Sequence, residues 1–160
     1  QLGDIPWIDH TRVGVMGFRF GANIAVRLAY LYPKLIKGVV ALGPLIHAFF
    51  TQAELQKKIP IMYLDVLASR LGLLNIDENN LRLSLSSYSL KNQGLIGRRM
   101  PVPMMSVYWK GDEISPKEDS QLIARSSMDG DIVEIKEKPL YKGLEQALTK
   151  SADWIYAKLI

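Results

Sequence analysis

The feature that most constrains the fold of this chain is a Gly-x-Arg-x-Gly pattern at residues 17–21, between a strand-like and a helix-like segment. Residues 12–17 form a short apolar run that predicts a buried strand, and residues 21–32 have the composition of a helix that Pro33 ends. In a sharp strand-to-helix turn, flanking glycines relieve crowding and let the central residue project outward. The pattern therefore predicts a strand that runs directly into a helix, with Arg19 at the apex.

The rest of the chain alternates strand-like and helix-like segments. Residues 37–42 and 102–109 predict two more buried strands, and residues 131–137 alternate apolar and charged side chains as a strand nearer the sheet edge would. A helix is predicted over residues 117–126. A final helix would carry one apolar face made of Leu144, Leu148, Ala152, Ile155 and Leu159. Strands separated by helices predict the α/β class, with a mostly parallel sheet covered by helices on both faces.

Residues 45–101 interrupt this alternation, since they contain no strand-like run. Thr51 and Glu54 fit a capping box, which predicts the start of a helix there. Pro60 is expected to open a helix that runs through Leu71 and is closed by Gly72. Residues 77–92 predict a further helix. An all-helical insertion after a sheet strand indicates a cap over the strand ends.

Composition narrows the function classes. A length of 160 residues favours one compact domain, and no run of about 18 apolar residues could span a bilayer. The chain has no cysteine and two histidines, so neither a disulfide nor a metal site is expected, and it has no nucleotide-binding motif, so no cofactor is expected. The net charge of +4 is spread along the chain, which argues against nucleic acid as a partner. Residue 1 is Gln and no leader pattern follows, so we expect the chain to begin inside a larger protein.

In the α/β-hydrolase fold, the residue at such an apex is the nucleophile, normally Ser. Arg19 stays protonated and has no lone pair with which to attack a carbonyl. It would also lie at a helix N-terminus, where positive charge is unfavourable without an anion. Two interpretations stay open: Arg19 and the first helical N–H groups bind a carboxylate or phosphate, or Arg19 forms an internal ion pair with a carboxylate at a neighbouring strand end.

The candidate carboxylate is Asp112, because the Asp-x-x-x-Pro spacing of Asp112 and Pro116 is similar to the segment that carries the catalytic acid in α/β-hydrolases. Its alternative role is to cap the turn. The third member of a triad should follow the strand at 131–137, but residues 138–143 contain no histidine. His47 could face the pocket or merely bond a backbone carbonyl. Trp109 could line the pocket or belong to the core.

Four segments resemble the fermentation–respiration switch protein (FrsA) family: the Arg-bearing residues 17–21, and residues 42–47, 64–72 and 111–116. The resemblance implies an α/β-hydrolase fold with a helical cap, in a cytoplasmic bacterial protein of esterase type. It also implies that an N-terminal region precedes the Arg-bearing turn at residues 17–21 (the elbow), so that residues 1–160 are the C-terminal portion of one domain, with the cap at residues 45–101. It further implies a link to carbon metabolism through the glucose-specific IIA component of the phosphotransferase system.

Two functions follow as hypotheses. The first is an esterase-type enzyme for a small carboxyl substrate that works without a Ser-His-Asp triad. In it Arg19 and Asp112 are catalytic, and Phe18, Phe20, His47 and Trp109 bind the substrate together with Arg19. The second is a non-catalytic, degenerate hydrolase that acts as a regulatory binding module, with the cap surface between residues 51 and 99 contacting the IIA component. Neither hypothesis involves a membrane.

Overall fold

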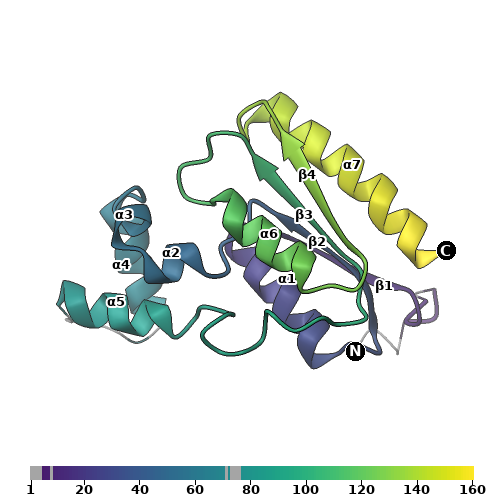
Figure 1. Ribbon diagram of the computed structural model, residues 1–160, viewed down its shortest axis with the longest axis horizontal. Helices are drawn as coiled ribbons and strands as arrows, with labels where there is room; N and C mark the ends of the chain where they lie inside the picture. Colours follow the sequence, from purple (N-terminus) through teal and green to yellow (C-terminus); the bar gives the residue numbers. More distant parts are fainter. Residues whose placement is uncertain (1–4, 8, 71, 73–76) are drawn as a thin grey trace.

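The computed structural model describes residues 5–7, 9–70, 72 and 77–160. Within them, four strands form one parallel sheet in the order β1-β2-β3-β4 (Figure 1). The strands are β1 (Val13–Phe18), β2 (Ile36–Leu42), β3 (Met104–Trp109) and β4 (Gly130–Ile135). All four strands predicted from the sequence are confirmed. Because every strand runs in the same direction, their carboxyl ends lie along one edge of the sheet.

Three helices cover the sheet, with α1 (Phe20–Leu31) and α6 (Lys117–Arg125) on one face and α7 (Tyr141–Leu159) on the other (Figure 1). Strand β2 shows how the two faces arise. Val39 and Ala41 pack under α1, whereas Val40 and Leu42 pack against α7, because successive side chains of a strand point to opposite faces. Both faces are therefore buried at the two central strands, as the sequence predicted for a parallel sheet, whereas the outer strands β1 and β4 keep exposed side chains.

Between β2 and β3, the described residues form an insertion with four helices, followed by turns: α2 (Ala48–Thr51), α3 (Ala53–Gln56), α4 (Ile61–Arg70) and α5 (Glu78–Ser86). It extends to one side of the sheet, beyond the carboxyl end of β2 (Figure 1). Leu45, Phe49, Phe50 and Leu85 give the insertion a small core of its own. None of the helices in the described ranges has the length and apolar character that crossing a bilayer requires.

The helix boundaries in the insertion differ from prediction at one point. Thr51 ends α2 instead of starting a helix, and its hydroxyl donates back to the carbonyl of His47 at 3.1 Å. Helix α3 starts after Gln52 with no side-chain cap, so the predicted capping box with Glu54 is wrong. Glu54 instead pairs with Lys57 one turn later.

The other two predictions for the insertion hold in part. Helix α4 follows Pro60 and is followed by Gly72 at a φ of 71°, as predicted, while Leu71 lies outside the described residues. The helix predicted over residues 77–92 starts with Asp77 as its cap but ends at Ser86, since residues 87–92 form turns.

The apolar face of α7 is only partly as predicted. Leu144 and Ile155 pack on the sheet, but Leu148 is 43% exposed and Ala152 is also exposed. The buried residues of the helix are small ones: Gly143, Ala147 and Ser151. Small side chains let a helix approach a sheet closely, so here proximity rather than side-chain size decides which face is buried.

Candidate functional site

The turn between β1 and α1 is a strained elbow with Arg19 at its apex. Arg19 has φ 55° and ψ −115°, a backbone conformation that side chains other than glycine rarely adopt. A Cβ on Gly17 would lie 2.1 Å from the carbonyl oxygen of Gly21, so position 17 must be glycine. A Cβ on Gly21 would meet nothing within 4 Å, so the predicted crowding is confirmed at the first glycine and not at the second.

Arg19 makes an internal ion pair with Asp112, which follows β3. Nη1 of Arg19 donates to Oδ2 of Asp112 at 2.5 Å, and the two side chains are only 17% and 3% exposed. Parallel strands place both residues at the same edge of the sheet although 93 positions separate them in the sequence. Of the two interpretations of Arg19, an anion-binding site or an internal ion pair, the structure shows the internal ion pair.

The other oxygen of Asp112 caps the turn that precedes α6. Oδ1 accepts hydrogen bonds from the backbone N–H groups of Ile114 and Ser115, both at 3.2 Å. The two roles considered for Asp112 are thus combined in one carboxylate, one oxygen for each. With three donors on it, this carboxylate holds the guanidinium in a fixed position.

Two aromatic rings and a glycine enclose the guanidinium. Its central carbon lies 5.2 Å from the ring centre of Phe18 and 5.7 Å from that of Trp109, both within the range of cation–π attraction. Trp109 is buried and its indole N–H donates to the carbonyl of Gly143 at 3.2 Å, so it belongs to the core as well as to the site. A Cβ on Gly43 would lie 2.9 Å from Nη1 of Arg19, which leaves room at that position for glycine alone.

His47 lies at the start of α2, where its Nδ1 is 2.8 Å from the hydroxyl of Ser89. Burial lowers the pKa of His47 below its ordinary value of 6.5, and the nearby Asp119 opposes that change. In the described part of the chain, His47 makes no hydrogen bond to Arg19 or Asp112. Its polar partners belong to the insertion and to α6.

Asp119, which was not among the predicted site residues, fastens the insertion to α6. Its buried carboxylate accepts hydrogen bonds from the backbone N–H groups of Ile46, His47 and Ala48, at 3.1 Å for the shortest bond to each. Burial raises the pKa of Asp119, and these backbone bonds act in the opposite direction. No signal in the sequence distinguishes it, because an acid in the first turn of a helix is common on any exposed helix.

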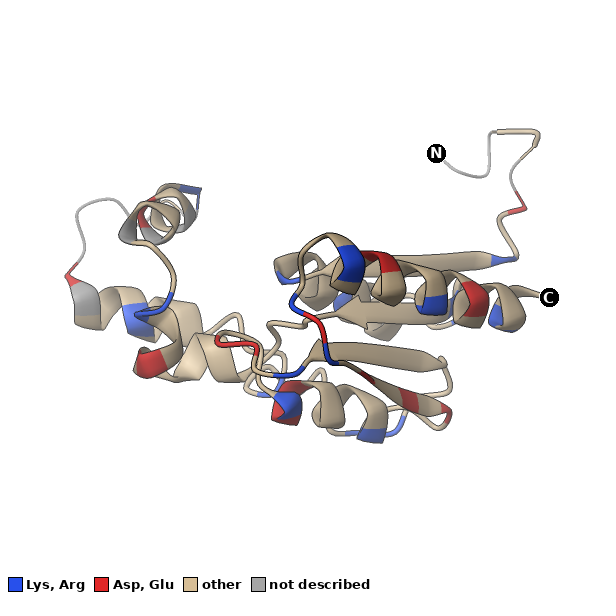
Figure 2. Ribbon diagram, turned by 90° about the horizontal axis from the view of Figure 1, so that it is seen from above, with Lys and Arg blue, Asp and Glu red and all other residues tan. Residues whose placement is uncertain are grey.

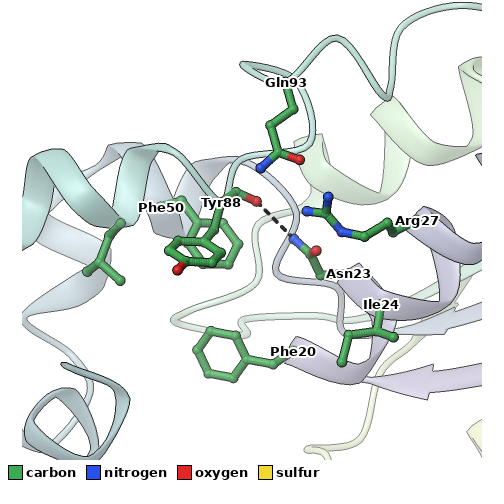
Figure 3. Close-up of a pocket in the computed structure, with 8 residues that line it drawn as sticks. Phe20, Asn23, Ile24, Arg27, Phe50, Tyr88 and Gln93 are labelled. Carbon is green, nitrogen blue, oxygen red and sulfur yellow. Dashed lines mark hydrogen bonds between the residues drawn. The ribbon is translucent and has the colours of Figure 1, made fainter. Parts of the chain in front are cut away.

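A second group of side chains lines a pocket of about 390 Å³ between α1 and the insertion (Figure 3). Phe20, one of the predicted substrate contacts, belongs here and not beside the guanidinium. Its ring packs edge-on against Phe49 and Phe50, with centroids 5.4 and 6.0 Å away. The remaining lining residues are Asn23, Ile24, Arg27, Phe50, Leu85, Tyr88 and Gln93, which sequence reasoning missed.

The predicted site residues therefore fall into two places. Arg19, Asp112, Phe18 and Trp109 meet at the sheet edge, whereas Phe20 and His47 contact the insertion. No three His, Asp or Glu side chains among the described residues gather as metal ligands would. Along α7, lysines alternate with acids (Figure 2).

Comparison with solved structures assigns the fold. The protein AbyA5 superimposes with a TM-score of 0.68 at 23% identity, over 91% of this chain and 43% of that one. The mouse α/β hydrolase domain-containing protein 10 superimposes with a TM-score of 0.59 at 16% identity, over 98% of this chain and 66% of that one. The chain thus has the α/β-hydrolase fold, with an arginine at the elbow.

Sequence comparison assigns the family. The family described as Esterase FrsA-like matches residues 1–160. Proteins named Esterase FrsA from Serratia proteamaculans and Photorhabdus laumondii are 52% and 55% identical over 159 residues, which is 99% of this chain. The chain belongs to this family, and it spans 38% of the length of these two relatives.

Proposed function

We propose that the intact protein hydrolyses small carboxylic esters at the elbow, with water as the nucleophile and Arg19 as the group that stabilises the oxyanion. The observation that carries this proposal is the held guanidinium at the apex of the elbow. Arg19 has five N–H donors, its bond to Asp112 uses one, and its side chain is still 17% exposed.

The chemistry requires no group on the protein to form a covalent bond. Water adds to the ester carbonyl carbon, and the negative charge that develops on the carbonyl oxygen is accepted by the free N–H donors of Arg19. The C–O bond to the alkoxide then breaks, and the alkoxide takes the proton that the water gives up. Asp112 keeps the guanidinium in place and is a positioning residue, because its two oxygens already accept three hydrogen bonds. The ring of Phe18 offers the ester an apolar wall, since it is 46% exposed beside Arg19.

The test is hydrolysis of p-nitrophenyl acetate by the intact protein. The double variant Arg19→Gln, Asp112→Asn replaces the ion pair by two neutral side chains. We expect its kcat to be about a hundredfold lower, because an oxyanion donor is removed. Arg125→Gln is the matched control, because Arg125 is exposed at the end of α6, away from the elbow. Unchanged hydrolysis in the neutral-pair variant, or labelling of the elbow by a fluorophosphonate, would contradict the proposal.

A second candidate function is a non-catalytic binding module, and the sealed Arg19–Asp112 pair favours it because a satisfied cation has less need of a substrate anion. In this proposal the insertion contacts the glucose-specific IIA component in the cytoplasm. Helix α4 offers a surface for such a contact, since Met62, Tyr63 and Val66 are each about 60% exposed there.

The two functions can be separated by calorimetry between the intact protein and the purified IIA component. Replacing Met62 and Tyr63 by Ser should weaken the complex about tenfold, whereas Leu148→Ser on α7 should not. If the intact protein gives no heat of binding with the IIA component, or if both variants bind it equally well, this second function is contradicted.

We also propose that residues 1–160 are the C-terminal portion of one domain, with residues 45–101 as its cap. Strand β1 lies at an edge of the sheet formed by the described residues, so a further strand could pair with its outer backbone, and the greater length of the relatives supports the same proposal.

A further inference from the structure

The pocket between α1 and the insertion is built around a cation that has no carboxylate. Arg27 lies in this pocket, and no acid among the described residues pairs with it. None of the residues that line the pocket is acidic. Arg27 is partly exposed, so in the free protein its guanidinium is left to water and stays available to an anion from elsewhere.

The lining is divided into a polar and an apolar end (Figure 3). Arg27, Asn23 and Gln93 point toward one another at one end, while the rings of Phe20, Phe50 and Tyr88 lie at the other. The Asn23 amide donates to the carbonyls of Leu45 and Tyr88 at 3.2 and 3.3 Å, so it is held in place by the insertion. This distribution is typical of small-molecule sites, where apolar walls surround a few placed polar groups.

The length of the pocket follows from helix geometry. Phe20, Asn23, Ile24 and Arg27 have the spacing i, i+3, i+4, i+7, which places them along one face of α1. Arg27 follows Phe20 by seven positions, so their Cα atoms lie about 10 Å apart along the helix axis. A ligand of that length reaches from one end to the other.

We propose that this pocket binds an amphipathic monocarboxylate, with its apolar body against Phe20, Phe50 and Leu85 and its carboxylate on Arg27. One guanidinium matches one carboxylate in charge and can bond both oxygens. A phosphate monoester carries nearly twice that charge at neutral pH and would need a second cation. Gln93 is placed to add a hydrogen bond, because its amide nitrogen carries a second hydrogen besides the one donated to Ser87.

This site goes beyond the proposed hydrolysis, since the ligand contains no ester and the elbow pair takes no part. The probe is octanoate, which has about the length of the pocket, measured by calorimetry on the intact protein. Octanol lacks the charge and acetate lacks the body, so each should bind at least about tenfold more weakly than octanoate.

Five variants test the polar end of the pocket and its apolar lining. Arg27→Gln should weaken octanoate binding about tenfold or more, and Arg27→Lys should weaken it less because the charge is kept. Arg125→Gln should leave octanoate binding unchanged. Ile24→Ser at the apolar end should also weaken binding, whereas Leu31→Ser should not, although both side chains are similarly exposed on α1 at 59% and 56%.

Binding of octanoate that is unchanged by Arg27→Gln, equal binding of octanol, or no saturable binding of octanoate would each overturn the proposal. Ester hydrolysis should be unchanged in Arg27→Gln, so failure at this pocket and failure at the elbow give different results.

Discussion

Helix α1 carries two arginines in opposite situations, and the contrast explains how the two regions of the molecule differ. Arg19, at the start of the helix, is enclosed by Asp112, Phe18 and Trp109 at the sheet edge. Arg27, two turns later, faces a pocket that contains no acid. The sheet edge is a place where several strand ends converge and can supply a partner, whereas the insertion supplies mainly apolar side chains. A cation is therefore satisfied internally in the first region and left available to a ligand in the second.

The largest effect on stability should come from substitutions of the two elbow glycines. These substitutions test how rigid the elbow is. Gly17→Ala should lower the free energy of unfolding by at least about 3 kcal/mol, because its Cβ would collide with backbone atoms of Gly21 and Ala22. Gly21→Ala should instead raise it by up to about 1 kcal/mol, since the added methyl meets open space inside a helix. Urea denaturation of both variants measures this. Equal effects at the two positions would show that the elbow is less constrained than its geometry indicates.

The next effect compares the two arginines through their partners. Asp112→Ala should lower the free energy of unfolding by about 3 kcal/mol, because it leaves a mostly buried guanidinium and two backbone N–H groups without an acceptor. Arg27→Ala should change it by less than about 0.5 kcal/mol, as is usual for a side chain with no partner to lose. If Arg27→Ala proves as costly as Asp112→Ala, the contrast between a satisfied and an available cation is wrong.

The smallest effect is on the pH dependence of stability, and it concerns two titratable groups at the insertion. The pKa of His47 is lowered by burial, so its neutral form is favoured in the folded state, and its contribution to stability is complete above the ordinary value of 6.5. That contribution is lost as pH falls through the lowered value. The raised pKa of Asp119 gives the opposite slope, because burial disfavours the charged form, and that form is produced as pH rises through the raised value.

The stability of the wild type should therefore fall between about pH 7 and about pH 5. We expect this fall to be smaller in the His47→Gln variant. Thermal denaturation at a series of pH values measures the slope. Lys91, which disfavours a positive charge on His47, provides a check: Lys91→Gln should shift the wild-type transition to higher pH. The same slope in wild type and His47→Gln would assign the pH dependence to other groups.

Much of the fold could be predicted because its signals are local. The apolar runs of the four strands and the glycine before Arg19 are properties of a few adjacent residues, and all four strands occur as predicted. The face of α7 could not be predicted in the same way. Hydrophobicity favours Leu148, but close approach to the sheet selects Gly143, Ala147 and Ser151, and that depends on distance between elements.

The site was predictable where two residues follow parallel strands. Arg19 and Asp112 each come after a strand, so their meeting at the carboxyl edge could be expected from the α/β pattern. The pocket beside Arg27 was not, because Phe50, Leu85 and Tyr88 come from an insertion whose position the helical pattern does not determine. The spacing of Phe20, Asn23, Ile24 and Arg27 was a visible signal, but amphipathic spacing alone indicates packing as readily as a ligand.

The link between Asp119 and the insertion depends on main-chain groups alone. Its carboxylate contacts three amides of residues 46–48, and any residue except proline presents such an amide. Side chains at those positions, and in the helices that follow, can therefore change without loss of the attachment. Homologous insertions of quite different sequence could be exchanged on this scaffold as modules, provided that the acid on α6 is kept.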